Sequence, residues 1–205
     1  MKLENIKIQK RIAEFWSWFL ENEPLLYYGT EHKDRRRDVL CQINEALKKL
    51  NKHLVFELSP ILEGELKEFI VSADGIKEAF PIVHQLIRYA PKHPNWAFIA
   101  FRPRLACNDL TISMGAIDFS YNDLFFRYVQ TDKEFGIELN VRNFNETIWE
   151  KNALFILLDA LIGEYDAATE IDWVEWTVLD ETEAEELFPF VELRKLVDER
   201  KQKRV

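Results

Sequence analysis

Apolar side chains recur every three or four residues in five stretches of the chain, a spacing that predicts helices. The first stretch has the strongest apolar stripe, and Trp18 lies at its edge. In the third stretch, 76–89, Pro81 is expected in the first helical turn, because proline lacks the backbone N–H group that a helix interior needs. The fourth is apolar almost all round from 153 to 162, which predicts a deeply buried helix that ends at Gly163. The five predicted helices are 5–22, 33–51, 76–89, 146–162 and 189–200.

Three residues are expected to mark the ends of these helices. Pro24 follows the first apolar stripe and is expected to end that helical region. Thr30 and Asn145 precede the second and fourth stripes, and their side-chain oxygens can accept hydrogen bonds from free helix amides. They are therefore the expected N-caps.

Other stretches alternate between apolar and polar residues, which predicts strands. Residues 96–101 are apolar at every position, so we expect a central strand covered on both faces. Residues 124–130 and 135–142 flank a short polar turn and predict a hairpin, in which alternate residues from Phe135 to Val141 face one way and the residues between them the other. The predicted strands are 54–58, 67–72, 96–101, 110–114, 124–130, 135–142 and 171–179.

The resulting element order is ααββαββββαβα, which predicts an α+β fold. Strands dominate the middle of the chain and have short connections, so we expect one mostly antiparallel sheet of about six or seven strands with helices packed on it. No linker-like stretch interrupts the pattern, which favours a single domain over 1–205. Strict βαβ alternation is absent, which disfavours a dinucleotide-binding fold.

Charge is distributed unevenly along the 205 residues. The chain has 27 basic and 36 acidic residues, and only 2 of the basic but 16 of the acidic residues lie in 134–192. Such an acidic third repels nucleic acid and favours a basic protein partner, although it could also be a solvated face that keeps the chain soluble. The 27 aromatic residues exclude a disordered acidic chain, and two cysteines exclude a disulfide scaffold.

The apolar runs are too short for membrane insertion. The longest, 153–158, is far below the roughly 20 residues of a membrane-spanning helix. Charged residues also interrupt the first 11 positions, so no signal peptide is expected there. We therefore expect a cytoplasmic protein without a membrane contact.

Known catalytic motifs are missing from the sequence. No glycine-rich phosphate-binding pattern or GxSxG motif is present, and six glycines leave little material for one. The four histidines do not have metal-ligand spacing, so neither a metal nor a cofactor is expected. Basic neighbours could activate Cys107, but no nearby histidine could act as its base, and no catalytic residue is identified.

Four charged residues are candidates for ligand binding: Arg102, Arg104, Asp159 and Glu164. The two arginines flank a proline at the end of a predicted strand, and arginine binds carboxylates in a bidentate manner. Asp159 lies in an apolar helical segment, where a carboxylate must find a partner or become neutral. The four could form one ligand pocket, or they could be structural ion pairs.

A basic run, 33–37, opens the second predicted helix. Positive charge there opposes the helix dipole, a local cost that suggests an anionic partner. The partner could be the acidic segment 134–192 of the same chain or an anionic ligand. Alternatively, these residues form a solvent-exposed helix face on which some of the charged side chains pair with one another.

Several short segments resemble those of uncharacterised bacterial hypothetical proteins of similar length. The segments are Phe15–Phe19, Ser72–Gly75, Ala90-Pro91 with Trp96, Phe101–Arg104, and Leu158-Asp159 with Gly163-Glu164. The resemblance brings no activity and assigns no functional residue.

The sequence thus favours a non-catalytic protein-interaction or binding module that uses its acidic third and exposed aromatics such as Trp18. A toxin-neutralising immunity protein is one specific form of it. The alternative is a small-ligand-binding protein or enzyme with Arg102, Arg104, Asp159 and Glu164 in one pocket. A structural subunit of a larger assembly would instead expose a contiguous apolar patch.

Overall fold

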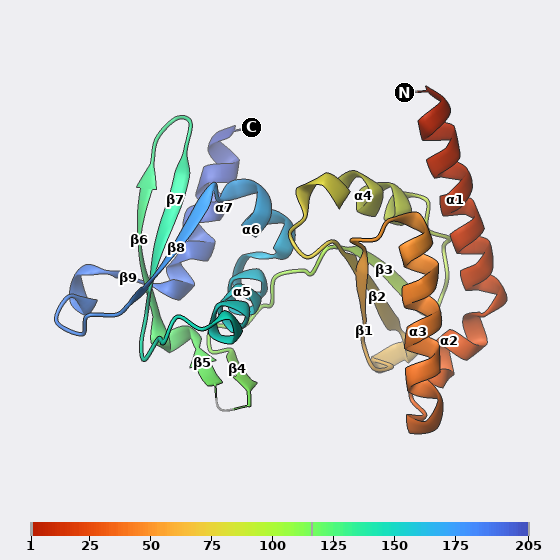
Figure 1. The fold of residues 1–205 in the computed structure, drawn as a ribbon, viewed down its shortest axis with the longest axis horizontal. Coiled ribbons are helices and arrows are strands. Elements are labelled where there is room, and N and C mark those ends of the chain that lie inside the picture. Colours follow the sequence, from red (N-terminus) through yellow and green to blue (C-terminus); the bar gives the residue numbers. More distant parts are fainter. Residues whose placement is uncertain (1, 116, 205) are drawn as a thin grey trace. The chain divides into compact units, whose positions relative to one another are not determined.

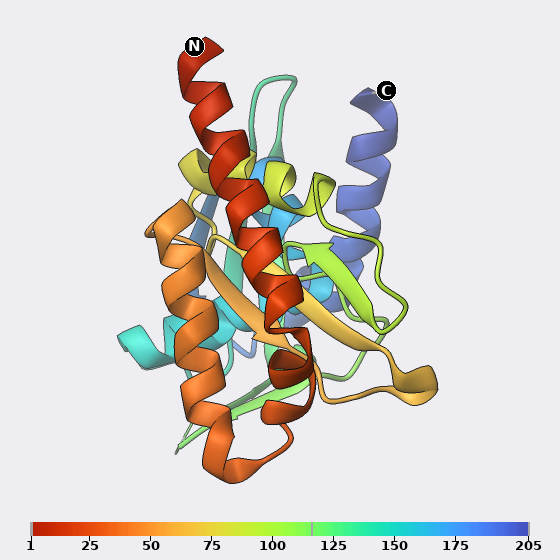
Figure 2. The same cartoon turned by 90° about the vertical axis from the view of Figure 1, so that its right-hand side faces the viewer.

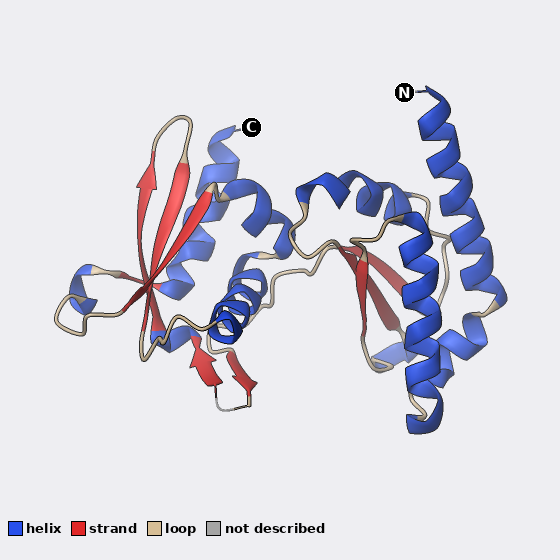
Figure 3. Cartoon of the chain, viewed as in Figure 1, coloured by secondary structure: helices blue, strands red, loops and turns tan. Residues whose placement is uncertain are grey.

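The computed structural model describes residues 2–115 and 117–204. Helices and strands are both abundant, so the α+β class is confirmed (Figure 3). The chain divides into two compact units, Met1–Arg102 and Pro103–Val205, here called unit 1 and unit 2. Each unit has its own sheet and helices (Figure 1). The single domain expected from the sequence stays a prediction.

The described residues form three separate sheets, so the expectation of a single sheet is wrong. Their strand orders are β1-β2-β3, β4-β5 and β8-β7-β6-β9. An apolar pattern shows that a segment is a strand but does not show which other strand will accept its backbone hydrogen bonds. The first sheet ends where Phe101 adopts a positive φ of 63°. The strands are β1 (Val55–Leu58), β2 (Lys67–Ser72), β3 (Trp96–Ala100), β4 (Thr111–Met114), β5 (Ile117–Ser120), β6 (Leu124–Gln130), β7 (Phe135–Val141), β8 (Trp173–Val178) and β9 (Phe188–Pro189).

The described residues of unit 1 form four α-helices, and the sequence missed one of them. Pro24 starts the extra helix α2 instead of ending a helical region, since proline fits the first turn of a helix. Thr30 is not the cap of α3, which begins after His32. Pro81 lies in the first turn of α4, as predicted. The helices are α1 (Lys2–Glu21), α2 (Glu23–Gly29), α3 (Lys33–Leu50) and α4 (Phe80–Arg88).

The core of unit 1 is aromatic. Strand β2 lies between an antiparallel β1 and a parallel β3, so the predicted central strand β3 is an edge strand of this sheet. Helices α1 and α3 lie over this sheet, and Figure 2 shows them in front of its strands. Trp16 and Phe19 of α1 pack on Phe69 and Phe98, with the rings of Trp16 and Phe98 4.6 Å apart. Ring burial of this kind attaches the helices to the sheet.

In unit 2 the predicted hairpin of β6 and β7 is confirmed. Phe135, Ile137, Leu139 and Val141 of β7 are buried, but so are Gly136 and Asn140, so burial does not alternate along this strand. Strand β8 runs parallel to β7, and the two-residue β9 pairs with β6. The chain then ends in a helix, α7, that starts four residues later than expected. The helices are α5 (Ile148–Ile162), α6 (Glu164–Glu170) and α7 (Leu193–Arg204).

Thr147, and not Asn145, caps α5. The Thr147 side chain accepts a hydrogen bond from the Glu150 amide, and the Glu150 carboxylate accepts one from the Thr147 amide. This reciprocal arrangement satisfies two backbone donors at the helix start. Burial raises the pKa of Glu150, but the hydrogen bonds from Asn145 and Thr147 outweigh it, so its pKa lies below the ordinary value.

None of the helices in 2–115 and 117–204 combines the length and the apolar character that crossing a bilayer requires.

Candidate functional site

Arg102 is held within unit 1 by an ionic network. Its guanidinium donates to the carboxylate of Glu57, to Ser72 Oγ at 3.0 Å and to Asp74 Oδ1 at 2.8 Å. Burial lowers the pKa of Arg102, but its hydrogen bonds to the Glu57 and Asp74 carboxylates outweigh this effect, so its pKa is raised. Much of its hydrogen-bonding capacity is therefore used inside the protein.

The other three predicted ligand-binding residues lie in unit 2. Both oxygens of Asp198 accept from Nη1 of Arg104, at 2.8 and 2.9 Å. Asp159 is half-buried on α5, and Glu164 is buried at the start of α6. None of the four predicted residues lines either of the two cavities of unit 1 described below. Their shared pocket stays a prediction.

Candidate metal and thiol chemistry has little structural basis. Among the residues that the structure describes, no group of three or more histidines, cysteines and carboxylates could hold a metal ion. Cys41, which lies on α3, is exposed, and Cys107 is half-buried. The Cys107 carbonyl accepts a hydrogen bond from Arg194, an interaction that serves the fold.

Lys67, the first residue of β2, is fully buried in unit 1. The Lys67 side chain is 0% exposed, yet its ammonium donates to Tyr27 O, Thr30 Oγ1 and Glu31 Oε1 at 2.5–2.8 Å. These three acceptors match the three donors of an ammonium group. The hydrogen bond from Lys67 lowers the pKa of Glu31, because it stabilises the carboxylate form. Sequence reasoning missed this site, because a single lysine at the start of a strand gives no local signal.

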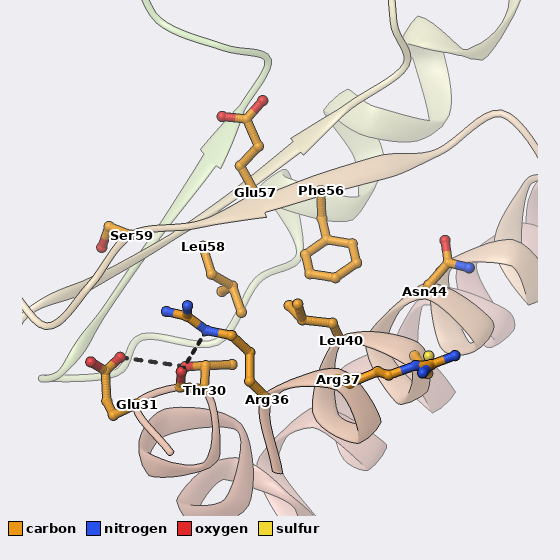
Figure 4. A pocket seen from close by; sticks show the side chains of 11 residues that line it. Thr30, Glu31, Arg36, Arg37, Leu40, Asn44, Phe56, Glu57, Leu58 and Ser59 are labelled. Atoms are coloured by element: carbon orange, nitrogen blue, oxygen red, sulfur yellow. Dashed lines mark hydrogen bonds between the residues drawn. The ribbon is translucent and has the colours of Figure 1, made fainter. Parts of the chain in front are cut away.

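A groove lies beside that lysine, between β1 and α3 (Figure 4). Its volume is about 660 Å³, within the range of ligand-binding clefts. Phe56 and Leu58 point from β1 towards Leu40 of α3, whereas Glu57 points to the opposite face of the sheet. The groove therefore has an apolar floor. Its lining residues are Thr30, Glu31, Arg36, Arg37, Leu40, Cys41, Asn44, Phe56, Glu57, Leu58 and Ser59.

A second and smaller cavity, of about 340 Å³, lies between α1 and α3. Trp18, the aromatic residue at the edge of the predicted stripe, lines it and is half-buried. Charged side chains from both helices surround it, with Arg11 and Glu14 on α1 and Lys49 on α3. Because both positive and negative side chains line the cavity, it favours neither an anionic nor a cationic ligand.

Helix α5 exposes four large apolar residues together with the polar Asn152. We call these five residues the α5 face: Ile148, Trp149, Asn152, Phe155 and Ile156. At 3.6 residues per turn these positions cover an arc of about 120°. The exposed fractions are 67% for Ile148, 63% for Trp149, 47% for Phe155 and 45% for Ile156. The expectation of a helix buried all round is thus wrong for this arc.

The remaining arc of α5 anchors the helix in the core of unit 2. Leu154, Leu157 and Leu161 are fully buried there. On the exposed arc, the Phe155 ring packs edge-on against Trp176 of β8, with their centroids 5.0 Å apart. The α5 face is therefore held on a rigid support, as expected of a preformed binding surface.

No family model, curated protein or solved structure matches the chain. The geometry of these surfaces is therefore the basis on which a function can be inferred.

Proposed function

We propose that the chain is a non-catalytic protein-interaction module and that the α5 face of unit 2 binds its partner. One observation carries this proposal: a helix that is apolar almost all round leaves two isoleucines, a tryptophan and a phenylalanine in solvent. A helix of that composition is normally covered on every side. Contiguous exposed apolar surface on a soluble protein marks a binding site for another protein.

The residue types on the α5 face fit this role. Tryptophan and other aromatic residues are enriched at the centres of protein interfaces, where few residues supply most of the binding energy. Trp149 is the most exposed aromatic residue of the face and the best candidate for such an anchor. Phe155 is fixed by its contact with Trp176, so little side-chain entropy is lost when a partner covers it.

The charge of unit 2 supports a basic partner. Unit 2 carries 11 basic and 22 acidic residues, whereas unit 1 carries 16 basic and 14 acidic residues. The net negative charge of unit 2 accelerates encounter with a basic protein and disfavours nucleic acid. A toxin-neutralising immunity protein is one specific form of this module, with a basic toxin as the partner.

The alternative is a small-ligand-binding protein or enzyme that uses Arg102, Arg104, Asp159 and Glu164. It has less support, because Arg102 and Arg104 already form ion pairs with carboxylates outside that set. These carboxylates are Glu57 and Asp74 for Arg102 and Asp198 for Arg104.

The test uses the tagged full chain as bait in native lysate of the organism that encodes it, followed by measurements on the purified partner. We expect Trp149→Asp to weaken binding of the purified partner by about tenfold or more, as loss of an interface anchor does. We expect the dissociation constant to rise with salt concentration if the partner is basic. An immunity-type partner would also lose its toxic activity in the complex.

Val129→Asp is the matched control, because Val129 is an equally apolar residue of unit 2 that is 50% exposed outside α5. This variant should bind like the wild type. Equal binding by Trp149→Asp and the wild type would contradict the proposal. Turnover of a small molecule by the purified chain that is lost in Arg104→Ala would favour the alternative.

A further inference from the structure

The outer edge of β1 offers free backbone hydrogen-bonding groups. Strand β1 is antiparallel to β2, and the Ser59 amide donates to Glu68 O at 3.1 Å. Backbone groups in such a ladder point alternately towards and away from the neighbouring strand. Val55, Glu57 and Ser59 therefore face β2, whereas the N–H and C=O groups of Phe56 and Leu58 face outwards. Within the described ranges no strand pairs with this edge.

The groove between β1 and α3 lies along that edge. The side chains of Phe56 and Leu58 form its floor on the strand side, and Leu40 faces them from α3 (Figure 4). An extended segment beside β1 would place every second side chain on this floor. Its other side chains would point to the opposite face of the sheet. The groove thus combines a free strand edge with apolar contacts, as in recognition by strand addition.

The uncompensated charge of the groove is positive. Two of its lining residues are carboxylates, but Glu31 is paired with Lys67 and Glu57 with Arg102. Arg36 donates through Nε to the Thr30 carbonyl at 2.8 Å, which fixes its side chain over the groove. In the described part of the chain neither Arg36 nor Arg37 has a carboxylate within ion-pair distance, although the charge of Arg36 also acts on nearby Glu31. These two guanidinium groups therefore select an anionic occupant.

We propose that this groove binds an extended, acidic segment of a partner protein that pairs with β1 as an added strand. Hydrogen bonds to Phe56 and Leu58 hold its backbone. The side chains on its groove side are both apolar and acidic: the apolar ones lie on the floor, and the carboxylates contact Arg36 and Arg37. The segment thus supplies the anionic partner that the basic run 33–37 requires. This site lies in unit 1 and does not depend on the α5 face.

The probe is a fluorescein-labelled peptide of about nine residues, a usual strand length. Every second residue, which faces the groove, is alternately valine and glutamate, and the residues between them are threonine. Its binding to the full chain is measured by fluorescence anisotropy, with a peptide that has lysine in place of each glutamate as its counterpart. We expect the glutamate peptide to bind and the lysine peptide to bind at least about tenfold more weakly, because charge complementarity decides recognition here. Equal binding of the two peptides would overturn the proposal.

The protein variants separate a local contact from a general charge effect. Arg36→Glu combined with Arg37→Glu should weaken binding of the glutamate peptide by about tenfold or more. Arg35→Glu is the matched control, because Arg35 is exposed on the same helix but does not line the groove. A similar loss in Arg35→Glu would overturn the site. Circular dichroism melting confirms that each variant is folded.

Methylation of the peptide backbone tests strand addition without altering the protein. N-methyl groups on every second amide of the glutamate peptide, placed in either of the two alternate sets, block the donors on one of its edges. One of the two methylated peptides should therefore lose binding by about tenfold or more, while the other keeps most of it. Equal binding by both methylated peptides and the parent would overturn strand addition. If the wild-type chain instead forms a dimer that the double arginine variant does not form, a second copy of this chain occupies the groove. That result would also overturn the proposal.

Discussion

Lys67 Nζ lies 2.7 Å from Glu31 Oε1, and the two residues differ in exposure: the lysine side chain is 0% exposed and the glutamate side chain 35%. A buried ammonium is tolerated because Tyr27 O and Thr30 Oγ1 accept its other two hydrogen bonds. The pair connects α2 and the start of α3 with the first residue of β2. It therefore positions the helical side of the groove relative to the sheet.

Replacement of Lys67 by methionine should destabilise the protein. The variant keeps most of the side-chain volume but leaves the Tyr27 carbonyl and the Thr30 hydroxyl without their donor. We expect the free energy of unfolding to fall by about 2–4 kcal/mol, measured by urea denaturation. Lys52→Met, at an exposed position, is the control and should change it by less than about 0.5 kcal/mol. If Lys67→Met has the same free energy of unfolding as the wild type, the hydrogen bonds of Lys67 do not hold β2 and the helices together.

The Lys67–Glu31 pair should make stability depend on acidity. The pKa of Glu31 lies below its ordinary value of 4.5 because of the hydrogen bond from Lys67. The stabilisation from Glu31 is therefore fully present above pH 4.5 and is lost as the pH falls through the lowered pKa. Melting temperatures of the wild type and Glu31→Gln should differ near neutral pH and converge in acid. Glu63→Gln, at an exposed carboxylate, should follow the wild type, and a constant difference for Glu31→Gln at every pH would argue against the linkage.

Gly136 provides space for the Trp173 ring across β7 and β8. A Cβ at residue 136 would lie 1.8 Å from Cε2 of Trp173, so Gly136→Ala must displace the indole. The displacement should also break the hydrogen bond from Trp173 Nε1 to Glu134. We expect a loss of about 1–3 kcal/mol in the free energy of unfolding, together with a shift in tryptophan fluorescence.

A double-mutant cycle isolates this contact. In the Trp173→Ala background the additional change Gly136→Ala should cost much less, because the clashing ring is absent. Additive losses in the double variant would mean that the glycine is needed for another reason, such as its backbone conformation.

Tyr121 carries a buried hydroxyl that has no hydrogen-bond partner among the described residues. Removal of an unsatisfied polar atom costs nothing, so Tyr121→Phe should leave the free energy of unfolding unchanged or raise it by up to about 1 kcal/mol. Tyr27→Phe is the matched control, because the Tyr27 hydroxyl donates to Glu65 O at 2.6 Å. This variant should lose about 1 kcal/mol. A comparable loss in Tyr121→Phe would reveal a partner for its hydroxyl.

Alkaline titration gives a second measurement on Tyr121. Burial raises its pKa from 10.0 to about 12, with a further contribution from Cys107. The folded state therefore keeps the proton over a range in which the unfolded chain loses it. The wild type should lose stability between pH 10 and about 12, and Tyr121→Phe should lose less. Identical alkaline unfolding curves would exclude a raised pKa.

Local patterns predicted most of the secondary structure. The stripes of α1 and α3 are properties of short segments, and the structure confirms them. The alternating pattern of β7 correctly predicts a strand, but both faces of that strand are largely buried. The pattern missed α2 because Pro24 can end a helix or begin one, and its own sequence does not distinguish the two. Asn145 was wrong as a cap because the nearby Thr147 side chain accepts from the same helix start. Thr30 was wrong because α3 begins later, after His32, which forms no side-chain cap hydrogen bond.

The sequence by itself determined the α+β class, the positions of most helices and strands, the acidic excess of unit 2 and the lack of known catalytic motifs. The tertiary structure decided the division into three sheets. The free backbone groups of a strand can pair with any other strand that folding brings beside it, so the sequence of the strand does not show its neighbour. It also decided which arc of α5 is exposed, since a helix without a polar side has no pattern that marks its solvent face. The acceptors of Lys67 are 36 to 40 residues away in the chain. Only folding brings such distant groups together, because the spacing of residues within one segment contains no information about another.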